Sequence, residues 1–187
     1  MFYPHNISPT TIQPAYHSKL HKDDMPVSCG CSLLPLVTTV RGPAESQQSG
    51  DDIVQEVITT FRANVLFKNF EILTPADRTM IYLTLYLQQL LKEVATGKVK
   101  DKKDAKTAFY QIAIKNFSVP GDSGWTLGGM FPQPAGREEA DSFKMWMKQA
   151  RTEMAERVLE VFFCADGSAN KWWVCFGKKK FMGKELL

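Results

Sequence analysis

The side chains best suited to hold a metal ion lie near the N-terminus. Three residues separate His17 from His21, and a single residue separates Cys29 from Cys31. Imidazole nitrogens and thiolates are the usual ligands of structural zinc, but two to four residues normally separate the paired cysteines of such a site. The pattern is therefore only half of a zinc motif. It predicts a polar segment with incidental thiols and no bound metal.

Catalytic chemistry finds little support in the sequence. The histidines, at positions 5, 17 and 21, all lie in a proline-rich segment, so no Ser/His/Asp or Cys/His set can be assembled on a rigid framework. The glycines between positions 121 and 129 lack the spacing of a phosphate-binding loop. Aspartate, glutamate and tyrosine could still act as acids or bases, but no constellation of them presents itself. We expect no enzyme, no cofactor and no small-molecule substrate.

Aromatic and lysine side chains are interleaved near the C-terminus, in the segment KWWVCFGKKKFMG (171–183). Such a segment could stack on nucleic-acid bases, anchor a core, or grip an acidic protein. Nucleic-acid readers usually present aromatic residues from a sheet or groove of a strongly basic domain. No sheet pattern is found here, so we expect no nucleic-acid partner. Because tryptophan can bury up to about 250 Å², we expect three aromatic residues to seal the core: Trp172, Trp173 and Phe176.

The net charge of +3 is distributed unevenly. Residues 171–187 hold five lysines and one glutamate, residues 98–106 hold five lysines and two aspartates, and the rest of the chain is net negative. Two basic patches on a slightly acidic body favour a localised anionic surface as the partner. We expect the 98–106 run to be a solvated turn. The lysines expected to face an acidic protein are Lys178, Lys179 and Lys180.

Length and composition are those of an ordinary soluble globular domain. A chain of 187 residues, with 44% hydrophobic and 23% charged residues, can bury a core without disulfides. The first residues carry no secretion signal, and the longest apolar run, 80–87, is shorter than the ~20 residues that a membrane span needs. The cysteines lack a framework spacing, which fits a reducing compartment. Cys164 and Cys175 adjoin aromatic residues and are expected to be buried. These features indicate a cytoplasmic protein with no membrane partner.

The elements that must position these residues fall into two zones. Residues 1–50 contain six prolines and are rich in Ser, Thr and Gln, which predicts an extended N-terminal arm. The apolar knot SLLPLV (32–37) within the arm is expected to dock on the body. The remaining residues, 51–187, are predicted to form one helical domain.

Capping residues and periodicity predict the first two helices. The first begins at Asp51 or Asp52, whose carboxylate can cap it, and carries apolar residues at every fourth position. The second has the clearest start in the chain, Thr74-Pro75-Ala76-Asp77, and is expected to end near Thr96, before Gly97. Because apolar residues cover nearly its whole circumference, this helix is expected to be central and buried.

The rest of the domain is also predicted to be helical. A third helix is expected from about Asp101 to Asn116, followed by a long 117–136 loop of a length that is often functional. A fourth helix is expected from about Arg137 to Phe163, and a short helix after Asn170. The near-heptad stripe of the fourth helix should pack in the core: Phe143, Met147 and Met154. The predicted fold is all-α, with four to five helices in one domain around a buried central helix.

Six groups of motifs occur in a specific order along the chain. They are PAYHS (14–18), LLPL with RGPA (33–36, 41–44), DIVQEVITTFRANVLFKNFEI (52–72), ADRTMIYLTLYL (76–87), NFSVPG (116–121) and KWWVCF with FM (171–182). In these motifs the chain resembles one family closely, subunit 3, the small helical subunit of the actin-related protein 2/3 complex. The resemblance covers nearly everything from Pro14 to the C-terminus.

The resemblance implies a non-catalytic structural subunit of a hetero-heptameric assembly that nucleates branched actin filaments. In that family the subunit is all-α and docks chiefly on actin-related protein 3, so the implied partners are actin-related protein 3, the other subunits and, through the complex, the actin filament. The implied location is the actin cytoskeleton of the cytoplasm. The arm, the loop and the tail would supply the partner-binding residues: Tyr16, His17, Leu34, Pro35, Trp125, Trp172, Trp173, Lys178, Lys179 and Lys180.

Some features depart from the family pattern. Residues 1–13 precede the usual start, so we expect an extension that is disordered or the product of a mis-chosen start codon. The Cys29-x-Cys31 pair and Gly177 are unusual, and Gly177 should weaken a C-terminal helix by up to about 1 kcal/mol. The lysine-rich 98–106 segment diverges as well. The alternative hypothesis is a free-standing helical adaptor that binds an acidic protein or RNA.

Overall fold

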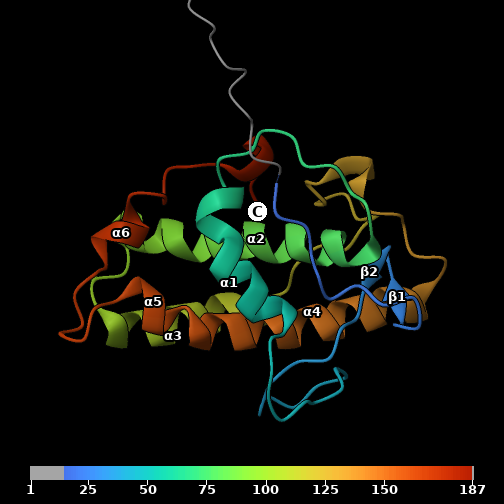
Figure 1. Cartoon of the computed structure of the whole chain (residues 1–187), viewed down its shortest axis with the longest axis horizontal. Helices are drawn as coiled ribbons and strands as arrows, with labels where there is room; N and C mark the ends of the chain where they lie inside the picture. The colour runs from blue at the N-terminus through green and yellow to red at the C-terminus, as the bar shows by residue number, and fades with distance from the viewer. Residues whose placement is uncertain (1–14, 187) are drawn as a thin grey trace, which may run out of the picture.

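Helices account for most of the regular structure in the computed structural model, which describes residues 15–186 (Figure 1). In chain order the helices are α1 (Ile53–Asn64), α2 (Pro75–Ala95), α3 (Lys102–Ile114), α4 (Arg137–Arg157), α5 (Leu159–Phe162) and α6 (Lys171–Val174), with 3-10 turns at Gly128–Met130 and Phe181–Gly183. An antiparallel hairpin of β1 (Val27–Ser28) and β2 (Cys31–Ser32) precedes them. The mainly helical architecture agrees with the predicted fold class, whereas the small hairpin was not predicted. The expected extension at 1–13 lies outside the described residues.

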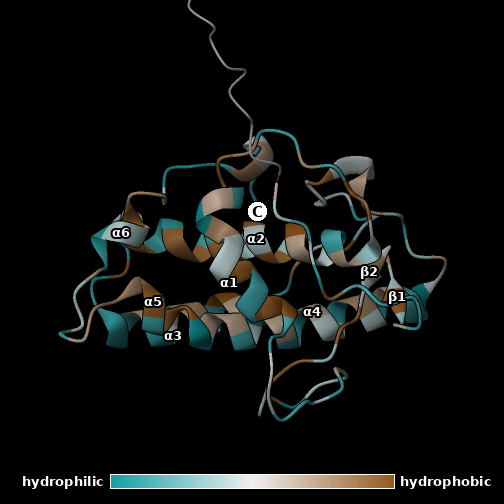
Figure 2. Ribbon diagram, viewed as in Figure 1, coloured by the Kyte–Doolittle hydropathy of each residue, from teal (hydrophilic) through white to brown (hydrophobic). Residues whose placement is uncertain are grey.

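The helix α2 runs through the centre of the molecule and packs against α1, α4, α6 and β2 (Figure 1). Its start confirms the predicted capping box: the Thr74 hydroxyl accepts a hydrogen bond from the Asp77 amide at 3.3 Å, and the Asp77 carboxylate accepts one from the Thr74 amide at 3.1 Å. Its end is also as predicted, because Gly97 adopts a left-handed φ of 73°. Apolar residues of α1, α2 and α4 face the shared interior, and hydrophilic residues lie along the outer side of α3 and α4 (Figure 2).

The N-terminus of α1 is joined to α4 and to the arm by one buried carboxylate. Asp52 caps α1 by accepting a hydrogen bond from the Gln55 amide at 2.9 Å, and its side chain is inaccessible to solvent. The same carboxylate accepts bonds from both terminal nitrogens of Arg157, at 2.7 and 2.6 Å, and from the Val37 amide at 2.9 Å. Arg157 also pairs with Glu153 at 2.8 Å. Three segments distant in sequence therefore depend on Asp52.

The helix α4 ends at Arg157, six residues earlier than predicted, and the single turn α5 follows it. Phe163 is extended and pairs with Ala169 in an antiparallel bridge, and Gly167 turns the chain between them with a φ of 81°. The Asn170 side chain donates to the Val161 carbonyl at 3.1 Å and holds this reversal. Apolar residues continue through the break, so the periodicity did not reveal it. The stripe of α4 is buried as predicted: Phe143, Met147 and Met154.

The described part of the arm is extended and packs against the helices. Leu34 and Leu36 are buried, which confirms the predicted docking of the apolar knot. The hairpin is tied to α4 by Glu139, whose carboxylate accepts from the Cys29 amide at 2.7 Å and whose carbonyl accepts from the Ser28 hydroxyl at 2.7 Å. Further along, Gln149 of α4 binds the backbone of the 40–44 loop in two places. The arm from residue 15 onward is thus built into the body.

Every helix within residues 15–186 is too short or too polar to cross a bilayer.

Candidate partner-binding surface

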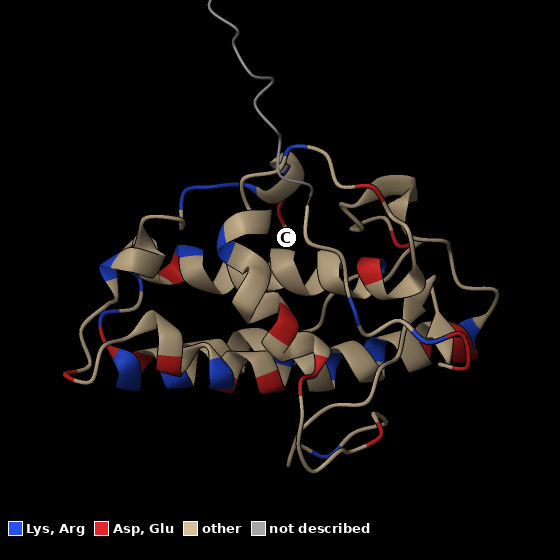
Figure 3. Cartoon of the chain, in the orientation of Figure 1, with Lys and Arg blue, Asp and Glu red and all other residues tan. Residues whose placement is uncertain are grey.

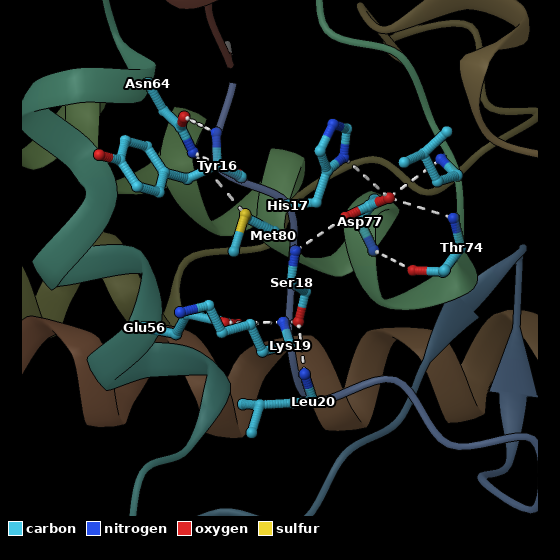
Figure 4. A network of polar contacts seen from close by, with 11 residues as sticks. Tyr16, His17, Ser18, Lys19, Leu20, Glu56, Asn64, Thr74, Asp77 and Met80 are labelled. Atoms are coloured by element: carbon cyan, nitrogen blue, oxygen red, sulfur yellow. Dashed lines mark hydrogen bonds and ion pairs between the residues drawn. The ribbon is translucent and has the colours of Figure 1, made fainter. Parts of the chain in front are cut away.

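The beginning of the described arm lies across α1 and α2, where buried side chains bind its backbone (Figure 4). Asn64 accepts a hydrogen bond from the Tyr16 amide and donates one to the Tyr16 carbonyl, both at 2.9 Å. Asp77 accepts one from the Ser18 amide, also at 2.9 Å. Reciprocal side-chain bonds of this kind replace the strand partner that an extended segment otherwise needs. The Tyr16 side chain itself is 46% exposed.

Glu56 of α1 continues this set of contacts. Its carboxylate accepts a hydrogen bond from the Ser18 hydroxyl at 2.7 Å and one from the Lys19 amide at 2.8 Å (Figure 4). Bonds to an ionised carboxylate are shorter and stronger than those between neutral groups. The arm is therefore anchored by three polar side chains of α1 and α2 rather than by apolar packing alone.

We expect Glu56→Ala to release this part of the arm locally. Each lost bond to a charged acceptor is worth about 1.5–3 kcal/mol, so amide exchange at Lys19 should accelerate roughly 10- to 100-fold. Gln55→Ala, at the neighbouring exposed position of α1, is the matched control and should leave that amide protected. Hydrogen exchange followed by mass spectrometry measures the difference. Equal protection in the two variants would contradict the anchoring role.

The histidine and cysteine residues considered as zinc ligands lie against other residues of the same chain. The His17 Nδ1 atom lies 3.3 Å from the Asp77 carboxylate, and the His17 ring packs on Phe70 with centroids 4.8 Å apart. Cys29 and Cys31 are fully buried, and burial raises the pKa of the Cys29 thiol to about 11 and that of Cys31 further still. Between residues 15 and 186, no three His, Cys, Asp or Glu side chains are placed to share a metal ion.

Two arm residues expected at the partner surface differ in exposure. Leu34 is 2% exposed in the core, and its carbonyl accepts a hydrogen bond from the Trp146 indole at 3.1 Å. Its side chain is therefore not presented to a partner. Pro35 is half-buried and borders a surface pocket of about 220 Å³ together with Met145. A partner-binding role for Pro35 and Tyr16 stays a prediction.

The 117–136 loop packs closely on α2 and α4. Trp125 is half-buried, lies parallel to the Tyr82 ring at 6.3 Å, and meets Phe131 and Phe143 edge-on. The Thr126 hydroxyl donates to the Glu185 carbonyl at 3.0 Å, which joins the loop to the C-terminal tail. The loop is thus a fixed part of the surface, and a partner contact of Trp125 would use only its exposed edge.

The two adjacent tryptophans of the tail have opposite environments. Trp173 is 8% exposed, stacks on Phe61 at 5.9 Å and contacts Phe162 at 5.3 Å. Trp172 is 68% exposed. The expectation that both seal the core is correct for Trp173 and wrong for Trp172, because neighbouring residues of a helical turn point about 100° apart. Phe176 is half-buried. Trp172 is consequently the tryptophan of this pair that is available to a partner.

Gly177 lies where the tail crosses the end of α2. A Cβ atom added there would overlap the Cβ of Ala95 and would approach the Leu91 carbonyl to 3.3 Å. The predicted weakening of a C-terminal helix is wrong, because α6 ends at Val174 and Gly177 lies beyond it. The absence of a side chain instead allows the two backbones to meet. Beyond this crossing, the Phe181 amide donates a hydrogen bond to the Gln88 side-chain oxygen at 2.6 Å. This bond attaches the tail to α2.

The two lysine-rich segments, whose lysines are blue at the start of α3 and in the tail (Figure 3), differ in their ion pairing. In the 98–106 segment, lysines pair with acids of the same chain: Lys98 with Glu93, Lys102 with Glu160 and Lys106 with Glu156. These pairs lie at the surface, so the solvated part of the prediction is correct, but the predicted turn covers only residues 98–101, because Lys102 and Lys106 belong to the first turns of α3. In the tail, Lys180 pairs with Glu185 at 3.3 Å, whereas Lys178 and Lys179 form no ion pair with any described residue.

The exposed side chains of residues 171–179 therefore form a basic aromatic surface. It contains Lys171, Trp172, Cys175, Lys178 and Lys179. The Lys171 ammonium lies 5.5 Å from the centre of the Trp172 ring, a cation–π distance. Cys175 and Cys164 are both exposed, so the expectation that they are buried is wrong. An exposed tryptophan beside unneutralised lysines is typical of a surface that binds another protein.

These observations define a class of protein, a small and mainly helical protein with an extended arm and an exposed basic aromatic surface. Comparison with known proteins specifies the family. Residues 13–186 match the family described as "P21-Arc: ARP2/3 complex ARPC3 (21 kDa) subunit". The chain belongs to this family, as its motifs had indicated.

Similar proteins from distant organisms carry the corresponding name, "Actin-related protein 2/3 complex subunit 3". The protein of Arabidopsis thaliana is 40% identical over 174 residues, which cover 92% of this chain and 99% of the relative. That of Dictyostelium discoideum is 42% identical and covers 82% of this chain and 88% of the relative. The protein of Schizosaccharomyces pombe is 40% identical, and the match covers 92% of this chain and 99% of the relative. The family match, over residues 13–186, extends over the described arm, the helices and the tail.

Proposed function

We propose that this chain is a non-catalytic structural subunit of the actin-related protein 2/3 complex and that it docks on actin-related protein 3. In this role it supports the nucleation of branched actin filaments. The observation that carries the proposal is the family match over residues 13–186, which includes the arm from residue 13 onward, the body and the tail. The names of the relatives support the same assembly.

The way in which the chain is held together fits a mechanical role. The arm is bound by α1 and α2, the 117–136 loop by α2, α4 and the tail, and the tail by α2. Within residues 15–186, these three irregular segments are thus held by contacts with the chain's own helices, without any partner. Binding then requires little further loss of conformational entropy, which favours tight and geometrically defined association. A stiff spacer between larger subunits needs this property.

The basic aromatic surface of this chain is the proposed site by which it docks on actin-related protein 3. Trp172 provides an exposed apolar area of the kind that dominates interface energetics, and the neighbouring lysines provide a positive rim. An acidic face on the partner would complement these charges and speed association. The exposed edges of Tyr16 and Trp125 are further proposed contacts.

Charge reversal at the lysine triplet tests this docking site. We expect Lys178→Glu, Lys179→Glu and Lys180→Glu together to weaken co-purification with actin-related protein 3 at least about tenfold at low salt. The difference from wild type should shrink as salt rises, because exposed charges are screened. Replacing the same residues by arginine keeps the charge and is the control. Unchanged recovery of the glutamate variant at low salt would count against the site.

A native pull-down with mass spectrometry of the bound proteins tests the proposal as a whole. We expect actin-related protein 3 and the other subunits to be recovered, and gel filtration of the lysate to place the chain far above its own mass of 21.1 kDa. A free-standing adaptor for an acidic protein or RNA, the alternative, would elute near its own mass or shift on nuclease treatment.

A further inference from the structure

A groove lies between α3, α4 and the loop that precedes α1. Its volume is about 570 Å³, and its apolar lining residues are Val40, Pro43, Tyr110, Ile114 and Met145. Tyr110 is 51% exposed and Met145 is 54% exposed. Single exposed apolar side chains are common at protein surfaces, but several gathered around one hollow are typical of a contact site. None of the lining residues belongs to the basic aromatic surface, so the groove is a second candidate surface.

The groove continues into the smaller hollow of about 220 Å³ beside Pro35, because Pro43 and Met145 line both. The smaller hollow adds Met25 and Trp146 to the apolar lining. Methionine side chains are flexible and adapt to partners of different shape. The two hollows together have room for more than one apolar side chain of a partner.

The loop that forms one wall of the groove projects beyond α4 (Figure 1) and is held by contacts of the chain itself. Gln149 of α4 donates a hydrogen bond to the Val40 carbonyl and accepts one from the Ala44 amide, both at 2.8 Å. A Cβ atom added at Gly42 would overlap the Gln149 side chain, so glycine allows this close approach of loop and helix. A wall fixed in this way loses little conformational entropy when a partner binds.

The charges around the groove are unbalanced. Arg41 and Lys148 border the larger hollow, and none of its described lining residues is acidic. Neither cation forms an ion pair within residues 15–186, whereas Lys102 and Lys106 of the adjacent α3 pair with acids of α5 and α4. Glu45 borders the smaller hollow instead. An apolar hollow with unneutralised cations on its rim is complementary to apolar side chains that lie next to a carboxylate.

We propose that this groove binds a segment of a partner protein in which apolar side chains lie next to an Asp or Glu. The apolar side chains cover Tyr110 and Met145, and the carboxylate pairs with Arg41 and Lys148. A nucleic acid is a poorer match, because two cations neutralise few phosphates and the rest of the hollow is largely apolar. The groove adds a contact surface to the one in the tail and does not depend on it. A chain with two separate contact surfaces can bridge two neighbours.

Chemical crosslinking tests the carboxylate. The chain is purified with its native partners and treated with a carbodiimide, a zero-length reagent that joins an amine to a carboxylate in direct contact. We expect Lys148 to become linked to an Asp or Glu of a second protein, a product that the isolated chain treated in parallel cannot form. Lys106, which lies 2.9 Å from Glu156, is the positive control and should crosslink within the chain in both samples.

Oxidation by hydrogen peroxide of the same two samples tests the apolar contact. Susceptibility of methionine follows its exposure, so Met145 should be oxidised about tenfold more slowly in a sample in which about 90% of the chain is bound. Met147 lies on the same helix and is fully buried, so it gives the baseline of a covered methionine and should react slowly in both samples. Mass spectrometry of the peptides measures both rates.

The two readouts decide the proposal together. An intermolecular crosslink at Lys148 with slower oxidation of Met145 supports it, whichever protein is bound. Slower oxidation without the crosslink, or the crosslink without slower oxidation, overturns the stated chemistry of the partner. Recovery of the actin-related protein 2/3 subunits with neither effect overturns the groove and leaves the proposed function intact. If those subunits are not recovered, the proposed function fails, and the groove fails with it only when Lys148 and Met145 also show no effect.

Discussion

Replacing Asp52 by alanine is expected to lower the free energy of unfolding by about 3–5 kcal/mol. The substitution removes four hydrogen bonds, from the Gln55 amide, the Val37 amide and both terminal nitrogens of Arg157. It also leaves the guanidinium of Arg157 half-buried, with Glu153 as its remaining carboxylate partner. A buried charge that has lost its partner is more destabilising than the loss of the same pair at the surface.

The adjacent aspartate provides a matched control for this prediction. Asp51 is exposed, and its side chain makes none of these contacts. Asp51→Ala should therefore change the free energy of unfolding by no more than about 0.5 kcal/mol. Equilibrium unfolding in urea, followed by circular dichroism, measures both variants. Similar losses of stability in the two alanine variants would show that the Asp52 contacts between α1, α4 and the arm do not stabilise the fold.

The second large effect is expected at Trp173. Trp173→Ala should lower the free energy of unfolding by about 3–5 kcal/mol, because it leaves a cavity beside Phe61 and Phe162 and removes a stacked pair. For a domain of this size the melting temperature should fall by roughly 6–20 °C. Differential scanning calorimetry gives the value directly.

Trp172 is the control for Trp173, and it also separates stability from binding. Trp172→Ala removes a side chain that is 68% exposed, so stability should change by no more than about 0.5 kcal/mol. Binding to actin-related protein 3 should weaken by more than about 1 kcal/mol, as for an interface tryptophan. Loss of stability without loss of binding in this variant would show that Trp172 packs on its own chain and not on a partner.

Much of the helical framework could be predicted from local signals. The Thr74–Asp77 capping box and the left-handed Gly97 mark both ends of α2, because a cap acts within a few residues of the sequence. The choice between Asp51 and Asp52 could not be made in the same way. Asp52 is selected by Arg157, which lies 105 residues away and contacts it only in the folded chain.

The candidate surface was less predictable, because it depends on which face of a short element turns inward. Trp172 and Trp173 have the same chemistry, and the phase of α6 decides which of them is exposed. Cys164 is exposed because the chain reverses after α5, a feature that continuous apolar sequence concealed. Gly177 looked like a weak point of a helix until the close approach of Ala95 was known. The exposure of the lysine triplet followed directly from its charge.

Asp77 belongs to the capping box of α2 and also anchors the arm, since its carboxylate accepts hydrogen bonds from the Thr74 and Ser18 amides. Detachment of the arm should therefore destabilise the first turn of α2, and the amides of both segments should become accessible to exchange together. A segment anchored in this way does not search the solvent for a partner as a disordered segment does. Association with a partner should then be that of two preordered surfaces. We expect an ordinary association rate constant of about 10⁵–10⁷ M⁻¹s⁻¹ rather than the higher value that a disordered segment can reach.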